Sequence, residues 1–283
     1  MTSADLQPWM DRAGRFSALR MSVFLMVIAP AGWLGWLTAT GGLGVEPFKA
    51  ATHLTGEWAL WGLLIALAVS PLRRLLGWST LIGVRRMVGV SAFAYVLGHF
   101  GLYVLYQNGD LVKVASEIVS RSYLSIGFFV LVGMAALTAT SFDAAIRRMG
   151  GNWHRLHRLI YPLTALGIVH FFMQAKVDVA DAAMLAGVFV GLIYHRMVSR
   201  STVMPEIRVL IIAVLAGASA AGLEYLWHLT LTGLPADRVF LSNFDFEWEV
   251  RHPWLVMAIM TAPLPAMAAQ RIMRVYPRKV AHP

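Results

Sequence analysis

Two histidines in apolar segments are the residues of this sequence best suited to chemistry. His99 follows the stretch SAFAYVLG, and His170 follows IYPLTALGIV. Ionisable or coordinating side chains inside a membrane cost free energy and usually serve a function. Each lies 13 residues beyond a residue expected at the inner surface, Arg86 or His157, which corresponds to about 20 Å of helix. Two histidines at matched depth on neighbouring helices predict the two axial imidazole ligands of a b-type haem.

The residue beside His99 also suits a flat cofactor. Gly98 has no side chain, so a porphyrin could approach the helix backbone there. The alternative interpretation is that each histidine only hydrogen-bonds to a neighbouring helix. Both interpretations stay open on the residues alone.

A second site nearer the inner surface is suggested by His157, but its ligand set is incomplete. Thirteen residues turn an ideal helix by about 220° beyond whole turns. His157 and the outer histidine of its helix therefore share no face unless Pro162 bends or rewinds the helix. On the other helix of the pair, the matching position holds Arg85. His195, at the inner end of a later span, is the substitute ligand that the sequence favours.

The remaining histidines and one glutamate give weaker patterns. His154 is expected to be solvated or to face lipid headgroups, and His53 and His252 are expected to be structural residues at the outer surface. Glu224 and His228 are four residues apart, so they share a helix face. They would form either a proton or quinol site or a hydrogen-bonded pair.

These side chains must be positioned by membrane-spanning helices. Of the 283 residues, 58% are hydrophobic and 14% are charged, against roughly 25% charged in an ordinary soluble domain. In lipid the backbone must satisfy its own hydrogen bonds, so long apolar runs predict helices. The sequence predicts an all-α integral membrane protein, a polytopic bundle of about eight transmembrane helices. The predicted spans are residues 17–39, 57–72, 87–106, 123–141, 158–174, 179–197, 207–229 and 253–270.

The basic residues predict the orientation of the chain. If the N-terminus is cytoplasmic, the inner segments hold 18 of the 24 Lys and Arg residues, as the positive-inside rule requires. Both termini are then cytoplasmic. The net charge of +9 is an orientation signal, so we expect membrane lipid as a partner and no nucleic acid.

Several cofactor chemistries are excluded by composition. The sequence has no cysteine, which rules out disulfides, thiolate metal sites and iron–sulfur clusters. No segment is long enough for a soluble flavin or nicotinamide domain, and no G-x-G-x-x-G turn or P-loop occurs. No internal repeat is apparent.

Several segments together resemble a known family. These are residues 53–60 (HLTGEWAL), 70–78 (SPLRRLLGW), 85–89 (RRMVG) and 153–161 (WHRLHRLIY), with His99 and His170. They resemble the haem-binding membrane subunits of periplasmic methionine-sulfoxide reductase systems (the MsrQ family), within the ferric-reductase-like transmembrane group. The resemblance covers roughly residues 20–200.

The resemblance implies a set of ligands, partners and a location. It implies one haem b or two, bound by His99, His157 and His170, in the bacterial inner membrane. The implied electron donor is a cytoplasmic flavin reductase or quinol, and the implied acceptor is a periplasmic molybdenum-containing reductase that repairs oxidised methionine. FMN is also implied, although no motif locates its site. Arg85 and neighbouring arginines could bind haem propionates or a flavin phosphate.

The sequence departs from that family at its C-terminal end. We expect a six-helix haem-binding core over residues 1–200 and an additional transmembrane helix pair with an outer loop over residues 201–283. The leading hypothesis is an electron-transfer subunit rather than a complete enzyme. Two alternatives are a transporter or small-molecule binding protein without haem, and a self-contained ferric or oxygen reductase, which the missing nicotinamide domain disfavours.

Overall fold

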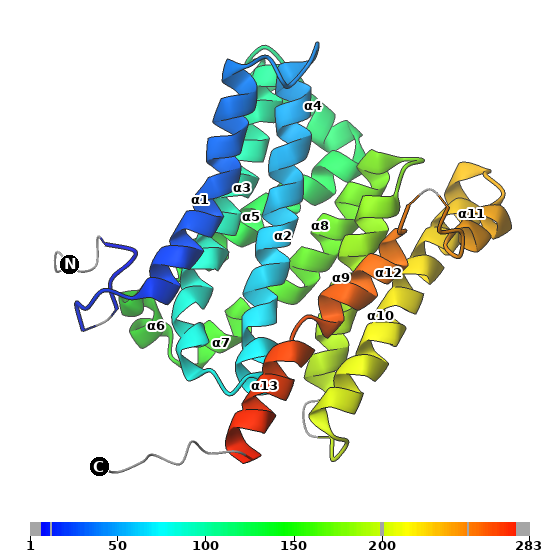
Figure 1. Cartoon of the computed structure of the whole chain (residues 1–283). Coiled ribbons are helices and arrows are strands. Elements are labelled where there is room, and N and C mark those ends of the chain that lie inside the picture. Colours follow the sequence, from blue (N-terminus) through cyan, green and yellow to red (C-terminus); the bar gives the residue numbers. More distant parts are fainter. Residues whose placement is uncertain (1–6, 12, 199–200, 248, 276–283) are drawn as a thin grey trace. The chain divides into compact units, whose positions relative to one another are not determined.

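The structure, a computed structural model, describes residues 7–11, 13–198, 201–247 and 249–275, and it is built of helices (Figure 1). The long helices are α1 (Ala18–Ala39), α2 (Pro47–Leu75), α3 (Arg85–Tyr106), α5 (Ser122–Ala139), α8 (Ile160–Ala175), α9 (Ala180–Met197) and α10 (Pro205–Trp227). The shorter helices are η2 (Ser79–Val84), α4 (Leu111–Ser120), α6 (Asp143–Met149), α7 (Gly151–His157), η3 (His228–Thr232), α11 (Ala236–Ser242), α12 (His252–Thr261) and α13 (Leu264–Val275). No strand occurs among these residues, and the predicted all-α class is confirmed.

Seven helical stretches of the described chain are long and apolar enough to cross a membrane. They are Ala18–Ala39, Pro47–Leu75, Ser79–Tyr106, Ser122–Ala139, Gly151–Ala175, Pro205–Thr232 and His252–Met273. The remaining predicted span, residues 179–197, forms helix α9, which is less apolar because Asp181, His195 and Arg196 lie within it. The predicted polytopic membrane protein is confirmed. The expectation that both termini are cytoplasmic falls on chain ends, 1–6 and 276–283, that lie outside the described residues.

Helix α2 begins ten residues before the predicted span at 57. The polar residues Lys49, Thr52 and His53 lower the hydropathy of this first part, so an apolar pattern misses it. The helix nevertheless forms, because Pro47 has a backbone angle suited to a first turn. The Thr52 hydroxyl donates a 2.7 Å hydrogen bond to the Phe48 carbonyl, which satisfies that polar side chain within the helix.

The chain forms two compact units. The first contains residues 1–66 and 83–174, and the second contains residues 67–82 and 175–283. Helix α9 therefore packs with the C-terminal helices. The predicted boundary at residue 200 separates the segment that resembles a known family from the additional helices. It does not describe how the helices pack, and it stays a prediction.

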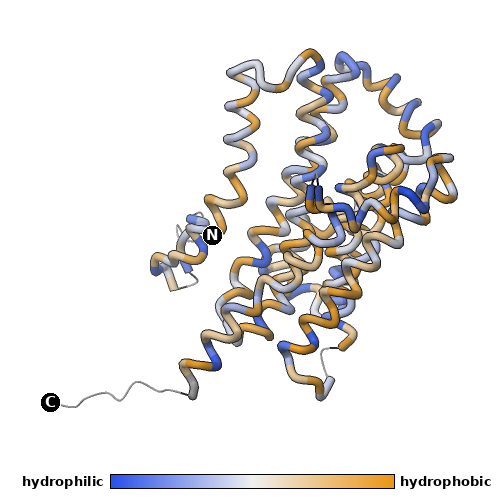
Figure 2. Tube along the Cα trace, turned by 45° about the vertical axis from the view of Figure 1, so that its right-hand side comes forward, coloured by the Kyte–Doolittle hydropathy of each residue, from blue (hydrophilic) through white to orange (hydrophobic). Residues whose placement is uncertain are grey.

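The core of the first unit lies between α2, α3, α5 and α8. Leu63, Ala92, Met134 and Thr164 are each at most 2% exposed. Hydrophobic residues recur along the full length of the long helices (Figure 2). The helices approach closely at small residues, as is typical of membrane bundles.

Helix α1 has no buried residue and contains Pro30. Tyr95 of α3 forms hydrogen bonds with the backbone of α1 on either side of this proline. The Tyr95 hydroxyl donates to the Val27 carbonyl at 2.7 Å and accepts from the Ala31 amide at 3.2 Å. A proline inside a helix disturbs the hydrogen-bond ladder around it. The tyrosine hydroxyl supplies partners at that point and ties α1 to α3.

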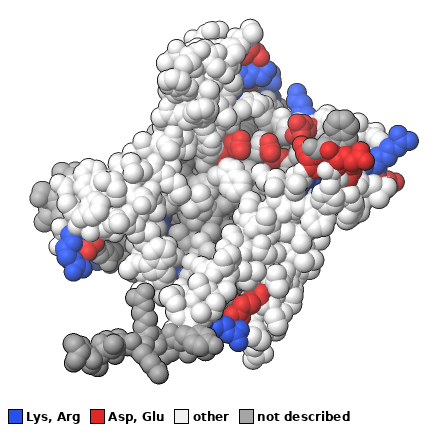
Figure 3. All heavy atoms as spheres, in the orientation of Figure 1, with Lys and Arg blue, Asp and Glu red and all other residues white. Residues whose placement is uncertain are grey.

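In the second unit, α9, α10 and α12 pack through glycine and alanine. An added Cβ at Gly187 would lie 2.7 Å from the Ala220 Cβ and 3.1 Å from a Val256 methyl group. An added Cβ at Gly217 would lie 2.8 Å from the Pro253 carbonyl oxygen. Only residues without a side chain allow backbones this close. Charged side chains are sparse on the face shown in Figure 3, as expected for a surface that contacts lipid.

Candidate functional site

His99 is held by helix α2. Its Nδ1 lies 2.8 Å from the Thr52 carbonyl oxygen. A carbonyl oxygen can only accept, so Nδ1 carries the proton and donates, and Nε2 keeps its lone pair. Gly56 lies one turn further along α2, where an added Cβ would be 2.8 Å from His99 Nδ1. The backbone of α2 therefore fixes both the tautomer and the position of the ring.

His170 on α8 is held by helix α5 in the same way. Its Nδ1 lies 2.7 Å from the Tyr123 carbonyl oxygen, so Nδ1 donates and Nε2 keeps its lone pair. An added Cβ at Gly127 would be 2.9 Å from His170 Cε1. Metal-binding histidines typically donate their other ring N–H to such an acceptor.

The two arrangements form an internal repeat that the sequence did not reveal. Each histidine follows its carbonyl acceptor by 47 residues. Residues Thr52, Gly56, Gly62, Ala92 and His99 correspond, each with an offset of 71 residues, to Tyr123, Gly127, Gly133, Leu163 and His170. Gly62 packs on Ala92 as Gly133 packs on Leu163. Few residue types match between the halves, which is why the pattern shows only in the contacts.

The two imidazole rings lie at a distance that suits one metal ion between them. Their centroids are 6.2 Å apart and their planes are at 88°. With about 2 Å from metal to nitrogen and about 1 Å from nitrogen to ring centre, two imidazoles on opposite sides of a metal have centroids about 6 Å apart. Within the part of the chain that the structure describes, no group of three or more His, Cys, Asp or Glu could hold a bare metal ion. Two imidazoles alone suit a metal whose other ligands come with it, as in haem.

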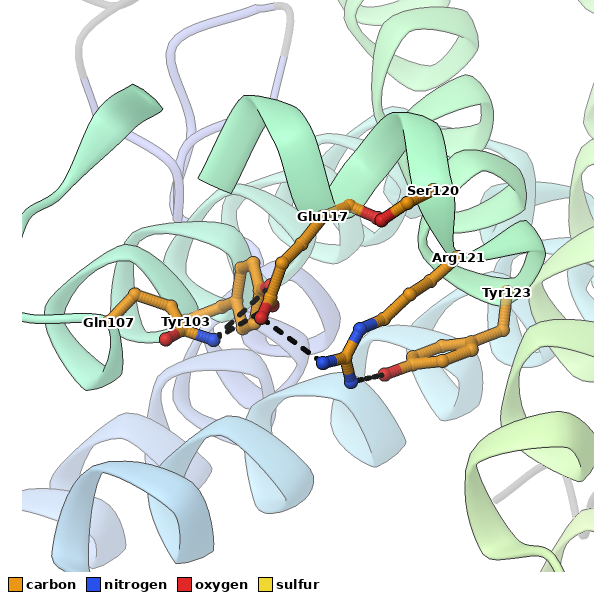
Figure 4. Close-up of polar contacts among 6 residues, drawn as sticks. All are labelled: Tyr103, Gln107, Glu117, Ser120, Arg121 and Tyr123. Atoms are coloured by element: carbon orange, nitrogen blue, oxygen red, sulfur yellow. Dashed lines mark hydrogen bonds and ion pairs between the residues drawn. The ribbon is translucent and has the colours of Figure 1, made fainter. Parts of the chain in front are cut away.

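A polar network on the expected outer side supports the first turn of α5, which contains Tyr123 (Figure 4). Glu117, on helix α4, accepts from Tyr103, from Gln107 at 3.0 Å and from Arg121 at 3.2 Å. Arg121 also donates to the Tyr123 hydroxyl at 3.3 Å. The carbonyl of Tyr123 is the acceptor of His170, so this network anchors one end of the site. This network was not predicted, although the i,i+4 spacing of Glu117 and Arg121 is a sequence signal for it.

His157 lies in a separate cluster with a different hydrogen-bond pattern. Its ring stacks on Trp153, with centroids 4.0 Å apart. Its Nε2 lies 3.1 Å from the Thr140 hydroxyl, whose proton goes to the Ala136 carbonyl. Nε2 is therefore the donor here, and Arg85 lies close enough for its charge to act on the ring. Among the described residues, the histidine whose charge acts on this ring is His154, three positions earlier on α7.

The helix that carries His157 and His170 is interrupted between them. Helix α7 ends at His157 and α8 begins at Ile160. Pro162 lacks the N–H that would bond to the residue 158 carbonyl, which explains the break. At the repeat position equivalent to His157 stands Arg86, whose Nη1 is 2.7 Å from Asp143 Oδ1.

The second unit contains His195, Glu224, His228 and His252. His195 is 6% exposed and lies beside Arg74 and Arg208. Glu224 and His228 share a turn of α10, in which the His228 N–H bonds to the Glu224 carbonyl, but their side chains have different partners. His228 Nδ1 lies 2.9 Å from the Thr232 hydroxyl. The proton or quinol site stays a prediction.

Glu224 instead belongs to a buried ion pair. It is 2% exposed and accepts from Arg251 at 2.9 Å. His252, expected at the surface, is 5% exposed, with its Nε2 3.6 Å from the second Glu224 oxygen. His154 is exposed against Trp153, and His53 is exposed on α2, both as expected.

Comparison with known proteins supports a membrane helix bundle that contains paired histidines. Residues 55–168 match the family of the ferric reductase like transmembrane component. A protein-methionine-sulfoxide reductase heme-binding subunit MsrQ of Rhodospirillum rubrum is 37% identical over 200 residues, which are 70% of this chain and 94% of the relative. The proteins of that name from Xanthomonas campestris and Agrobacterium fabrum are 38% and 36% identical over 65% and 64% of this chain and 87% and 84% of their own lengths. No solved structure gives a significant match.

The fold and the matched segment define a ferric-reductase-like transmembrane protein with paired histidines in its helix bundle. Since nearly the whole length of the Rhodospirillum relative is matched, the family can be stated more narrowly. The chain belongs to the MsrQ family of heme-binding subunits of protein-methionine-sulfoxide reductase.

Proposed function

We propose that this protein holds a b-type haem between His99 and His170 and is the membrane subunit that passes electrons to a methionine-sulfoxide reductase. The observation that carries the proposal is the pair of neighbouring imidazoles of His99 and His170, whose ring centroids are 6.2 Å apart. The names of the relatives, which are heme-binding subunits, support it. When bound, the haem supplies reversible one-electron chemistry.

The chain's own residues prepare the ligands. The carbonyls of Thr52 and Tyr123 hold each ring by Nδ1, so both Nε2 atoms are available without a proton. Hydrogen bonding of this kind also raises the basicity of the ligand. Gly56 and Gly127 leave the room that the rings occupy. Gly98 meets no atom within 4 Å of an added Cβ, which supports its expected role in leaving space for a porphyrin.

The surroundings of the site belong to the same proposal. The partner is a periplasmic molybdenum-containing reductase, and the donor is a cytoplasmic flavin reductase or quinol, in the bacterial inner membrane. Both chain ends are cytoplasmic and the additional helices follow residue 200. FMN remains an expected second cofactor, and Arg85 an expected anion ligand beside His157.

The number of haems depends on whether His157 is a haem ligand. The outer pair supports one haem. A second haem at His157 needs another ligand, and His195 is the one that we propose from the sequence. The ion pair of Arg86 and Asp143 occupies the equivalent place in the other half of the repeat, which favours a single site.

The test is a reduced-minus-oxidised optical spectrum of the purified protein, with haem counted by pyridine haemochrome. We expect bis-histidine b-haem bands that are lost in His99→Ala and His170→Ala and kept in His154→Ala, an exposed control. A lowered stoichiometry in His157→Ala or His195→Ala would establish an inner haem. Absence of haem from every haem-replete preparation would refute the proposal and favour a transporter.

A further inference from the structure

Two arginines and a buried histidine line a small cavity in the second unit. Arg74 lies in the last turn of α2, His195 in the last turn of α9, and Arg208 near the start of α10. Pro71 and Leu75 complete the lining. The cavity has a volume of about 30 Å³. One water needs about 10–15 Å³, so a group of a few atoms fits.

No carboxylate balances the charge of this cavity. Its lining contains two guanidinium groups, whose charges both act on the ring of His195, and no acidic residue. The nearest acid along the chain, Glu206, lies 3.8 Å from Arg271. The cavity adjoins the N-terminal end of α10 and the C-terminal ends of α2 and α9, so the helix dipoles oppose one another and the two guanidinium charges decide the sign. The electrostatic environment therefore favours an anion.

One polar group at the cavity lacks a partner. Arg208 Nε is buried and makes no hydrogen bond. Buried donors normally have partners, because leaving one unpaired costs the free energy of its desolvation. The ring of His195 beside it is also buried, at 6% exposure. A bound anion would supply the missing acceptor.

We infer that this cavity binds a phosphate group. Guanidinium groups offer several N–H donors in a planar fork that matches phosphate oxygens. The cavity lies at the ends of membrane-spanning helices that carry the basic residues, which is the level of lipid headgroups. The phosphate comes from an anionic lipid or from a soluble phosphate ester. His195 lines the same site.

The test uses the full-length protein, delipidated in a non-ionic detergent. Binding is followed by native mass spectrometry with phosphatidylglycerol and by the melting temperature with inorganic phosphate, at constant ionic strength. We expect binding to wild type, weakened about tenfold or more in Arg208→Gln and in Arg74→Gln. Arg73→Gln is the matched control, because Arg73 is adjacent and exposed but does not line the cavity.

The results separate the sources and the alternatives. Saturable binding of phosphatidylglycerol without an effect of phosphate assigns a lipid headgroup, and the reverse assigns a soluble phosphate ester. Arg208→Lys keeps the charge but not the fork, and weaker binding in it supports the inferred geometry. Should Arg208→Gln fail to fold, as judged by gel filtration, the exposed Arg74 still provides the test. Equal losses in Arg73→Gln and Arg74→Gln, or no binding of either probe, would overturn the inference.

Discussion

Replacing Gly56 by alanine tests the geometry of the histidine site directly. The added Cβ would lie 2.8 Å from His99 Nδ1 and 3.0 Å from its Cε1, whereas ordinary contact begins at 3.4 Å. The ring must therefore move by about 0.6 Å, the difference between 3.4 and 2.8 Å. Alanine is a better helix former than glycine, so helix α2 itself stays intact.

The expected effect follows from the hydrogen bond that this movement breaks. Nδ1 lies 2.8 Å from the Thr52 carbonyl, and a shift of this size takes the pair to the limit of a hydrogen bond. Loss of such an outer partner typically costs 10–100-fold in metal affinity. At about 1.4 kcal/mol for each factor of ten, this corresponds to roughly 1.4–2.8 kcal/mol of haem binding.

The assay is a titration of the haem-free protein with haemin, followed by the Soret band. Gly127→Ala should behave similarly, since its Cβ would lie 2.9 Å from His170. Gly89→Ala on α3 is the control, because a Cβ there meets nothing within 4 Å. Unchanged affinity and reduction potential in Gly56→Ala, together with loss of haem in His99→Ala, would show that contact with α2 does not position the ring.

Three further predictions concern stability. Glu224→Ala leaves Arg251 without its buried partner and should lower the free energy of unfolding by about 3–5 kcal/mol in thermal denaturation; Glu206→Ala, at a more exposed pair, should change it little. Tyr95→Phe removes two hydrogen bonds to α1 and should cost about 1–3 kcal/mol, seen as faster amide exchange around Pro30; exchange at the wild-type rate would contradict this. Gly187→Leu should destabilise the protein by about 1–3 kcal/mol through overpacking, and an unchanged melting temperature would argue against the close approach of α9 and α10.

The fold class and the proximity of His99 and His170 could be predicted because both depend on spacing along the chain. Apolar runs determine which segments span the membrane, and equal spacing along two helices brings His99 and His170 to one level. The acceptors of their Nδ1 atoms could not be predicted. They are backbone carbonyls, 47 residues away, and every residue has one.

The partner of Glu224 could not be predicted for a related reason. The turn from Glu224 to His228 is regular α-helix, but the i,i+4 rule says only that two side chains share a face and not which partner each one binds. Arg251 reaches the carboxylate from 27 residues away through the fold of the segment between α10 and α12. The arginines beside His195 come from other helices, so its neighbours could not be predicted either.

The internal repeat builds the histidine site from two similar helical hairpins. One helical hairpin with a single histidine cannot enclose a metal, but two copies that face each other can. A site of this kind is suited to arise when one such hairpin is duplicated or when two identical chains pair. The two halves are not identical, because one carries Arg86 where the other carries His157. The ligands and the glycines facing them are positions at which the two halves agree.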